Sequence, residues 1–83
     1  MEITVKFFAV YREKSGTSKK KMDLPKDSTV GSLVNEIVQL FPSLTQKPST
    51  LLVAVNDEYK DHKHILAKGD EVALIPPVSG GSI

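Results

Sequence analysis

Residues 27–42 read DSTVGSLVNEIVQLFP, and this stretch decides the fold class because it predicts one amphipathic helix. Its apolar residues recur at spacings of three and four, which places them on one stripe of a 3.6-residue period. Ser28 or Thr29 is suited to cap the N-terminus by accepting from a free backbone N–H, and Asp27 suits the positive end of the helix dipole. Pro42 blocks continuation of the helix. The stripe consists of Val30, Leu33, Val34, Ile37, Val38 and Phe41.

Patterns typical of strands flank the helix on both sides. Residues 2–8 alternate, with Ile3, Val5 and Phe7 on one side, which predicts a strand with one buried face. Residues 51–55 form an almost uninterrupted apolar run, which predicts a strand buried on both faces. The other predicted segments are a helical turn or irregular loop at 9–14, strands at about 18–24, 59–65 and 71–76, turns at 15–17, 56–57 and 68–70, and a loop at 43–50.

This order of elements predicts an α+β fold with a mixed sheet of about four to five strands. One helix is enough to cover one face of one sheet. The order is compatible with a β-grasp sheet, in which the first and last strands lie side by side, and it leaves a ferredoxin-like half or another small α+β fold open. Since 83 residues leave room for one packed core, we expect one domain over residues 1–76 and a flexible tail over 77–83.

Composition excludes several classes of function. The chain has no cysteine, so disulfides, thiolate zinc sites and cysteine nucleophiles are excluded together. The net charge of +1 gives no strong field for nucleic acid or anionic membranes. The longest apolar runs, about five residues, are far shorter than a membrane span, and the first ten residues lack the pattern of a signal peptide. We therefore expect a small cytoplasmic domain.

Few residues suggest chemistry within the domain. His62 and His64 have only Lys63 between them and no third ligand at a recognised spacing, so we expect solvated edge residues and no metal site. The basic run at 19–21 more often protects an exposed sheet edge than binds phosphate. No carboxylate pair, phosphate-binding loop or catalytic triad is present. The sequence therefore predicts no active site in the domain itself.

The C-terminal stretch is different. Pro76 and Pro77 end the last strand and hold the chain extended, and Val78 and Ser79 lead into Gly80 and Gly81, which have no side chains. A stiff exit with a slim tip suits threading a C-terminal carboxylate through a channel too narrow for a Cβ atom. The alternative is a frayed end without a role. Two prolines followed by two glycines favour a functional tail.

Four segments resemble the MoaD family, the sulfur-carrier subunits of molybdopterin synthase: FFAVYRE at 7–13, AVN at 54–56, GDEVALIPPV at 69–78 and SGG at 79–81. The resemblance covers nearly the whole chain in order and implies a ubiquitin-like β-grasp fold. It also implies that Gly81 is adenylated, is converted to a thiocarboxylate and donates sulfur to a cyclic pyranopterin monophosphate. Gly80 would then let Gly81 reach a partner's pocket, while Pro76 and Pro77 aim the tail.

The resemblance also implies partners. One is the large subunit of molybdopterin synthase, which holds the pterin precursor and the catalytic residues and assembles with the carrier as a heterotetramer. The other is an adenylating enzyme that uses ATP. The chain itself would be a carrier rather than the catalyst, with no bound cofactor or metal.

A docking surface follows from strand alternation. If Ile3 and Val5 meet the helix, Phe8 emerges on the uncovered face of the sheet, where alternation also puts Ile75. Tyr59 is expected at the edge of this group. Exposed aromatic and aliphatic residues grouped in this way mark a protein interface. The alternative is that the loop at 43–50 covers them.

Residues Ser82 and Ile83 depart from the family that the chain resembles, whose members normally end at the second glycine. They convert the reactive carboxylate of Gly81 into a peptide bond. Three explanations account for these two residues. A tail-processing protease removes them, they come from cloning or from the choice of reading frame, or this chain has lost the carrier function. Two other classes also stay open: a sulfur carrier of another, thiamin-type pathway, and a ubiquitin-like modifier or binding module.

Overall fold

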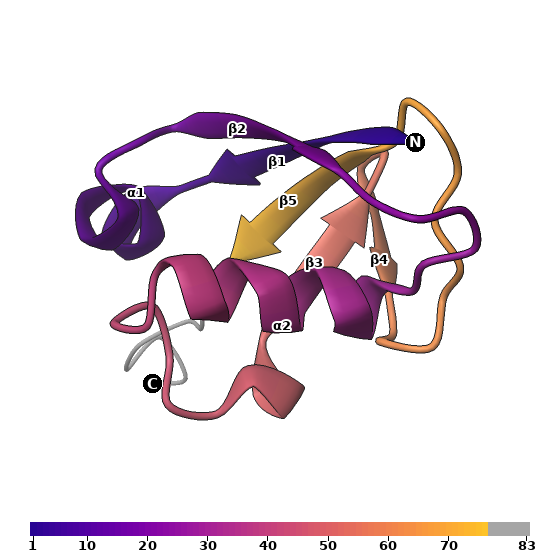
Figure 1. Ribbon diagram of the computed structural model, residues 1–83. Coiled ribbons are helices and arrows are strands. Elements are labelled where there is room, and N and C mark those ends of the chain that lie inside the picture. Colours follow the sequence, from indigo (N-terminus) through magenta and orange to yellow (C-terminus); the bar gives the residue numbers. More distant parts are fainter. Residues whose placement is uncertain (77–83) are drawn as a thin grey trace.

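A mixed β-sheet with one long helix packed across it forms the framework of the protein (Figure 1). The computed structural model describes residues 1–76, and within them five strands are hydrogen-bonded in the order β2-β1-β5-β3-β4. No helix of this part is long and apolar enough to cross a membrane. The elements are β1 (Glu2–Phe7), α1 (Ala9–Ser15), β2 (Lys19–Asp23), α2 (Val30–Leu40), a 3-10 turn η1 (Pro48–Thr50), β3 (Leu52–Val55), β4 (Glu58–Lys60) and β5 (Glu71–Ile75).

Strand β5 lies at the centre of the sheet. It runs parallel to β1, with Leu74 paired to Phe7, and antiparallel to β3, with Ile75 opposite Leu52. The first and last strands are thus side by side, which confirms the α+β prediction and the β-grasp arrangement. Strand β5 is hydrogen-bonded to a neighbouring strand on both edges. The sheet therefore fixes the position of Pro76, the residue that follows β5 and begins the C-terminal stretch.

Helix α2 begins at a capping box. The Thr29 hydroxyl accepts from the Ser32 N–H at 3.2 Å, and the Ser32 hydroxyl accepts from the Thr29 N–H at 3.1 Å. Of the two candidate caps, Thr29 therefore takes the role, and Ser28 donates to the carbonyl oxygen of Pro25 instead. The helix ends at Leu40, and the Phe41 ring that follows packs edge-on against Phe7 with the centroids 5.7 Å apart.

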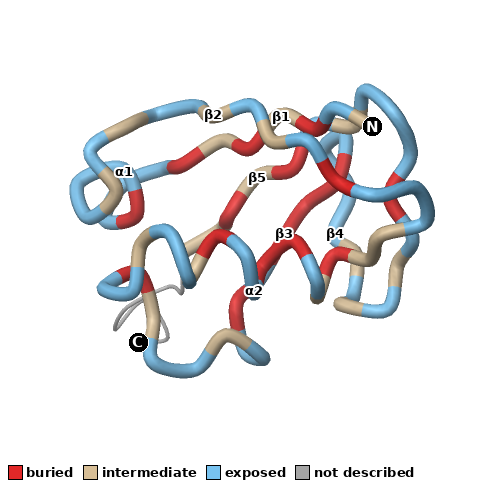
Figure 2. Tube along the Cα trace, viewed as in Figure 1, coloured by how far each residue is buried: buried red, intermediate tan, exposed pale blue. Residues whose placement is uncertain are grey.

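The core lies between α2 and the sheet. Figure 2 shows the buried residues concentrated on β1, β5, β3 and the inward side of α2. Alternation along β1 and β5 buries every second side chain, as the pattern of residues 2–8 predicts. The side chains without any solvent exposure are Ile3, Val5, Val30, Leu33, Ile37, Val72 and Leu74.

Two strand predictions are wrong in part. The stretch 51–55 is not buried on both faces, because the Leu52 side chain is 51% exposed on the side of the sheet away from α2. The strand expected at 59–65 contains only its first two residues within β4, and the chain then turns at His62 and Lys63. A single bridge between Ile65 and Thr29 is the remaining ladder contact of that segment.

The connection between β4 and β5 holds the N-terminus of α2. The carbonyl oxygens of His64 and His62 accept from the N–H groups of Val30 and Gly31, both at 2.9 Å. The ring Nε2 of His62 lies 2.7 Å from the carbonyl oxygen of Leu51. The expectation of solvated edge histidines is therefore wrong for His62, which is half-buried and ties this connection to the start of β3. Among residues 1–76 no group of three or more His, Asp and Glu side chains is placed to hold a metal ion.

Asn56 ties the turn between β3 and β4 to the start of β5. Its side-chain amide donates to Asp70 Oδ1 at 3.0 Å, and its Oδ1 accepts from the Glu71 N–H at 3.0 Å. The Asn56 N–H donates in turn to the Glu71 carbonyl oxygen at 2.8 Å. Asn56 also has φ +51°, a left-handed conformation that asparagine tolerates better than most residues. Asn56 and Asp70, from two of the motif segments, thus serve the fold.

Replacing Asn56 with alanine removes both side-chain hydrogen bonds and leaves alanine in the left-handed region. We expect Asn56→Ala to lower the free energy of unfolding by roughly 2–3 kcal/mol, measured by urea unfolding. Asp57→Ala is the matched control, because Asp57 has φ +72° in the same turn and its side chain is outside this hydrogen-bond network. Equal losses for the two variants would mean that the network contributes nothing and that strain explains the whole effect.

Candidate partner-docking face

Helix α2 covers one side of the sheet (Figure 1), and we call the other side, which carries the outward residues of all five strands, the open face. The strand registers align one row directly across it, from β2 to β4. That row is Lys19, Lys6, Ala73, Ala54 and Tyr59. A second row, toward the C-terminal end of β5, contains the pair Ile75 and Leu52.

Four large apolar side chains gather on this face, and we call Phe8, Leu52, Tyr59 and Ile75 the apolar patch. The side chains of Phe8, Leu52 and Tyr59 are 46%, 51% and 71% exposed, and Ile75 is half-buried. Because β1 pairs Phe7 with Leu74, position 8 follows directly beside position 75 at the same end of two neighbouring strands. Exposed aromatic and aliphatic groups in this arrangement are typical of a protein interface.

Leu52 is the member of the patch that the sequence interpretation misses. Its alternation with Leu51 and Val53 is visible in the sequence, but the run looks equally apolar on both sides. Only the register with β5, which places Leu52 opposite Ile75, identifies the side of the sheet on which it lies.

The start of α1 positions Phe8. Strand β1 ends at Phe7, and the Phe8 carbonyl oxygen accepts from the Tyr11 N–H at 3.0 Å to begin the helix. No side chain caps α1, whose N-cap residue is Phe8 itself.

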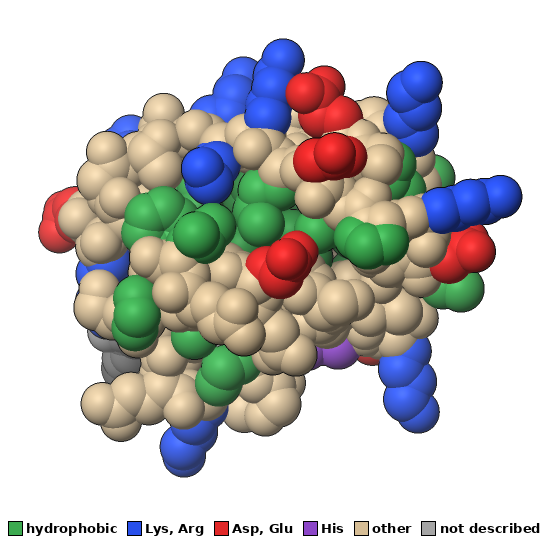
Figure 3. Space-filling view, in the orientation of Figure 1, with side chains coloured by type: hydrophobic (Ala, Val, Ile, Leu, Met, Phe, Trp, Pro, Cys, Tyr) green, Lys and Arg blue, Asp and Glu red, His purple; other side chains and the backbone are tan. Residues whose placement is uncertain are grey.

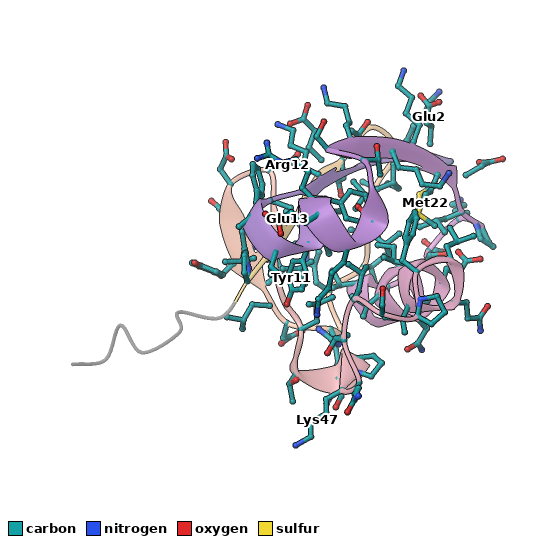
Figure 4. All side chains as sticks on the ribbon, turned by 90° about the vertical axis from the view of Figure 1, so that its left-hand side faces the viewer. Glu2, Tyr11, Arg12, Glu13, Met22 and Lys47 are labelled. Atoms are coloured by element: carbon teal, nitrogen blue, oxygen red, sulfur yellow. The ribbon has the colours of Figure 1, made fainter. Side chains whose placement is uncertain are left out.

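The side chains of α1 point to opposite sides of the helix. Figure 4 looks onto this end of the molecule and shows Tyr11 below α1, on the side of Lys47, while Arg12 lies on the opposite side.

The loop at 43–50 borders the apolar patch without covering it. Between the loop and the end of β5 lies a hollow of about 330 Å³. Tyr11 is buried there, and this burial raises the pKa of its phenol above the usual value, so the hydroxyl stays neutral. The lining residues are Tyr11, Thr45, Thr50, Leu51, Leu52 and Ile75. Since Phe8 and Leu52 stay about half exposed, the covering loop is not the correct alternative.

An ion pair adjoins the apolar patch. Lys6 Nζ lies 2.9 Å from Glu71 Oε1, across the β1–β5 pairing. The hydrogen bond to Lys6 lowers the pKa of the Glu71 carboxyl, and the same bond raises the pKa of the Lys6 ammonium. The charge of Lys19 lowers the pKa of Glu71 further. Charged groups therefore lie beside the apolar patch on its β1 and β2 side.

The opposite side of the molecule offers a weaker candidate. Figure 3 shows hydrophobic side chains gathered in the middle of the α2 side, between β2 and the helix. Met22, Val38 and Phe41 are partly buried and pack against the core. They are therefore largely committed to the fold, whereas the apolar patch projects from the sheet.

The structure places Pro76 directly after β5, next to Ile75 of the apolar patch, and Pro76 is half-buried. The other predicted residues of the tail lie outside the described residues. These are Pro77, Val78, Ser79, Gly80 and Gly81, together with Ser82 and Ile83.

Comparison with known proteins gives a consistent result. The chain matches the model of the ThiS family over residues 5–81. It is 40% identical to the molybdopterin synthase sulfur carrier subunit of Arabidopsis thaliana, over 98% of this chain and 84% of that protein. It is 42% identical to the subunit of the same name from Drosophila yakuba, over 98% of this chain and 92% of that protein.

Solved structures show the same fold. A putative molybdopterin converting factor, subunit 1, from Pyrococcus furiosus superposes with a TM-score of 0.84 at 27% identity, covering 94% of this chain and 99% of that one. The small archaeal modifier protein 1 of Haloferax volcanii gives 0.81 at 29% identity, covering 93% and 98%. A chain from the complex of subunits 1 and 2 of the molybdopterin-converting factor of Helicobacter pylori gives 0.68 at 26% identity, covering 98% and 100%.

Proposed function

The chain belongs to the ThiS family, and we propose that within it this chain is the sulfur-carrier subunit of molybdopterin synthase. The observation that carries this function is the 40% identity, over nearly the whole chain, to a sulfur carrier subunit of that synthase. The family match reaches residue 81 and so includes the two glycines that the proposed chemistry needs. The family resemblance seen in the sequence is thereby confirmed.

The chemistry that we propose takes place at Gly81. Its carboxylate attacks the α-phosphate of ATP on an adenylating enzyme, which forms an acyl adenylate and releases pyrophosphate. A sulfide-level donor then displaces AMP and leaves a glycyl thiocarboxylate. The thiocarboxylate sulfur then displaces an oxygen substituent from a carbon of the cyclic pyranopterin monophosphate and forms a thioester. Water attacks the acyl carbon of this thioester, which leaves the sulfur on the pterin and regenerates the carboxylate. We place this ATP-dependent cycle in the cytoplasm.

The chain acts in this cycle as a carrier rather than as the catalyst. The large subunit of the synthase supplies the catalytic residues, and the apolar patch is its docking site. The Helicobacter pylori structure, a complex of subunits 1 and 2, supports a partner of this kind. The patch lies beside the end of β5, so a partner bound to it meets the chain where the tail begins.

The intact mass of the protein isolated from its own cell tests this function. We expect a species that lacks Ser82 and Ile83, part of it heavier by the difference between sulfur and oxygen. Treatment with a thiol-alkylating reagent should shift only the heavier species. A full-length mass with no shorter species would leave Gly81 in a peptide bond and would contradict sulfur transfer by this chain.

The likeness to a small archaeal modifier protein favours one second candidate function. In that role the carboxyl group of Gly81 would form isopeptide bonds with lysine side chains of other proteins. A ladder of conjugates on a denaturing gel, detected with an antibody to this chain, would support the modifier. A single band near 9 kDa, together with the thiocarboxylate mass, would support the carrier.

A further inference from the structure

Three lysines give one side of the open face a positive charge. Lys19 and Lys21 project from β2, opposite Lys6 and Thr4 of β1 in the antiparallel register. Both side chains are exposed, and Figure 3 shows basic side chains along the β2 margin of the molecule. Lys6 and Lys19 both act on the carboxyl group of Glu71, which shows that these charges lie close together. We call Lys6, Lys19 and Lys21 the basic strip.

The charge on the open face is unevenly distributed. Glu71 is paired with Lys6, and the charge of Asp57 also acts on Lys6, so two carboxylates lie near the three lysines and the basic strip keeps a net positive charge. The acidic pair Glu2 and Asp23 lies at the other end of β1 and β2, away from the apolar patch. Within strands β3 and β4, the residues on the open face are Leu52, Ala54 and Tyr59, and none of these three is charged. A surface that fits this face must therefore be apolar over β3–β5 and acidic over β1–β2.

We propose that the large subunit binds the open face with an apolar centre flanked by carboxylates that lie against the basic strip. This inference rests on the proposed function and adds the chemistry of the partner surface. If the partner has carboxylates on just one side of its binding surface, they fix the orientation of the complex. A rotated partner would place these carboxylates against Glu2 and Asp23 or against the uncharged strands. The same charges raise the rate of association.

Protection of the sheet edge is the competing explanation, since β2 is an edge strand and lysines blunt such edges. The two explanations differ at Lys20. Its side chain has the opposite orientation, because it pairs with the buried Val5 rather than with Lys6 or Thr4. Edge protection involves the three lysines of β2 alike, whereas docking on the open face involves Lys19 and Lys21 but not Lys20.

The test measures binding of the purified large subunit to the full chain by surface plasmon resonance at several salt concentrations. We expect the double variant Lys19→Glu/Lys21→Glu to bind roughly tenfold more weakly at low salt, chiefly through slower association. The difference should shrink below about threefold in 0.5 M salt, where exposed charges are screened. Lys20→Glu is the matched control and should bind within about twofold of the wild type.

Each result has one meaning. A weakened double variant with an unchanged Lys20→Glu supports the acidic partner surface. Equal binding of the double variant and the wild type, or equal weakening by Lys20→Glu, overturns it while leaving the docking function intact. If the wild-type chain itself does not bind the large subunit, the proposed function fails as well. The circular dichroism spectrum of each variant is compared with that of the wild type, so that a variant with altered folding is recognised before its binding is interpreted.

Discussion

A chain that carries Phe8→Asp is expected to fold like the wild type and to bind the large subunit roughly 100-fold more weakly. The loss in binding follows from burying a carboxylate where the apolar patch presents an aromatic ring. Aromatic side chains at the centre of an interface commonly contribute 2 kcal/mol or more, and about 1.4 kcal/mol corresponds to a tenfold change in affinity. Isothermal titration calorimetry with the purified large subunit measures the effect.

The fold is expected to survive because of the position of Phe8 in the chain. Phe8 is the N-cap residue of α1, has an extended backbone (φ −118°, ψ 153°) and makes no side-chain cap. Aspartate is among the best residues at that position, so the free energy of unfolding should stay unchanged or rise by up to about 1 kcal/mol. Loss of binding in a chain that is unfolded would not support the docking site.

A matched control places the same charge elsewhere. Ile65 is 57% exposed, comparable with Phe8, and lies beside Thr29 at the N-terminus of α2. Ile65→Asp should therefore bind the large subunit as the wild type does. If Phe8→Asp binds with unchanged affinity, the apolar patch is not the docking site.

The second large effect concerns the bond that follows Gly81. With adenylating enzyme, ATP and sulfide present, a chain that ends at Gly81 should form the thiocarboxylate, and one that retains Ser82 and Ile83 should not. The expected difference is about 1,000-fold or more, because an amide carbonyl in the middle of a chain has no carboxylate to attack ATP. Mass spectrometry of the reaction products measures it directly.

A chain that ends at Gly80 is the informative control. It still presents a glycine carboxylate, but its reach is shorter by roughly 3.5 Å. We expect it to be adenylated poorly and to lose at least about 100-fold in sulfur transfer, since displacements of about 1 Å already cost that much. Thiocarboxylate formation by the chain that keeps Ser82 and Ile83, with no change in its length, would exclude Gly81 as the sulfur-bearing residue.

The sequence predicts the elements whose signal is local. The stripe of α2, its cap and the alternation of β1 depend on neighbouring residues, so each can be recognised without knowledge of the rest of the chain. Leu52 shows the limit of prediction from local patterns. Whether the second side of β3 is buried depends on a layer of structure above it, and a local pattern does not contain that information.

The same limit applies to the candidate site. Phe8 and Ile75 can be placed on one side because strand alternation and the adjacency of the first and last strands suffice. The hydrogen bonds of Asn56 to Asp70 and Glu71, and of His62 to Leu51, join residues far apart in sequence. Spacing alone does not predict such contacts. The basic strip likewise needs the register of β2, because the run at 19–21 shows three equivalent lysines in the sequence.

The central place of β5 has a consequence for how the protein is made. The five-stranded sheet of residues 1–76 has β5 between β1 and β3, so the pairs β2–β1 and β3–β4 lack the strand that joins them until residue 75 is synthesised. Pairing β1 with β5 also closes a loop of most of the chain, which slows folding. On the ribosome, the nascent chain therefore completes its sheet only after β5 has left the exit tunnel, and until then β1 and β3 each have an unpaired edge of the kind that is prone to aggregation.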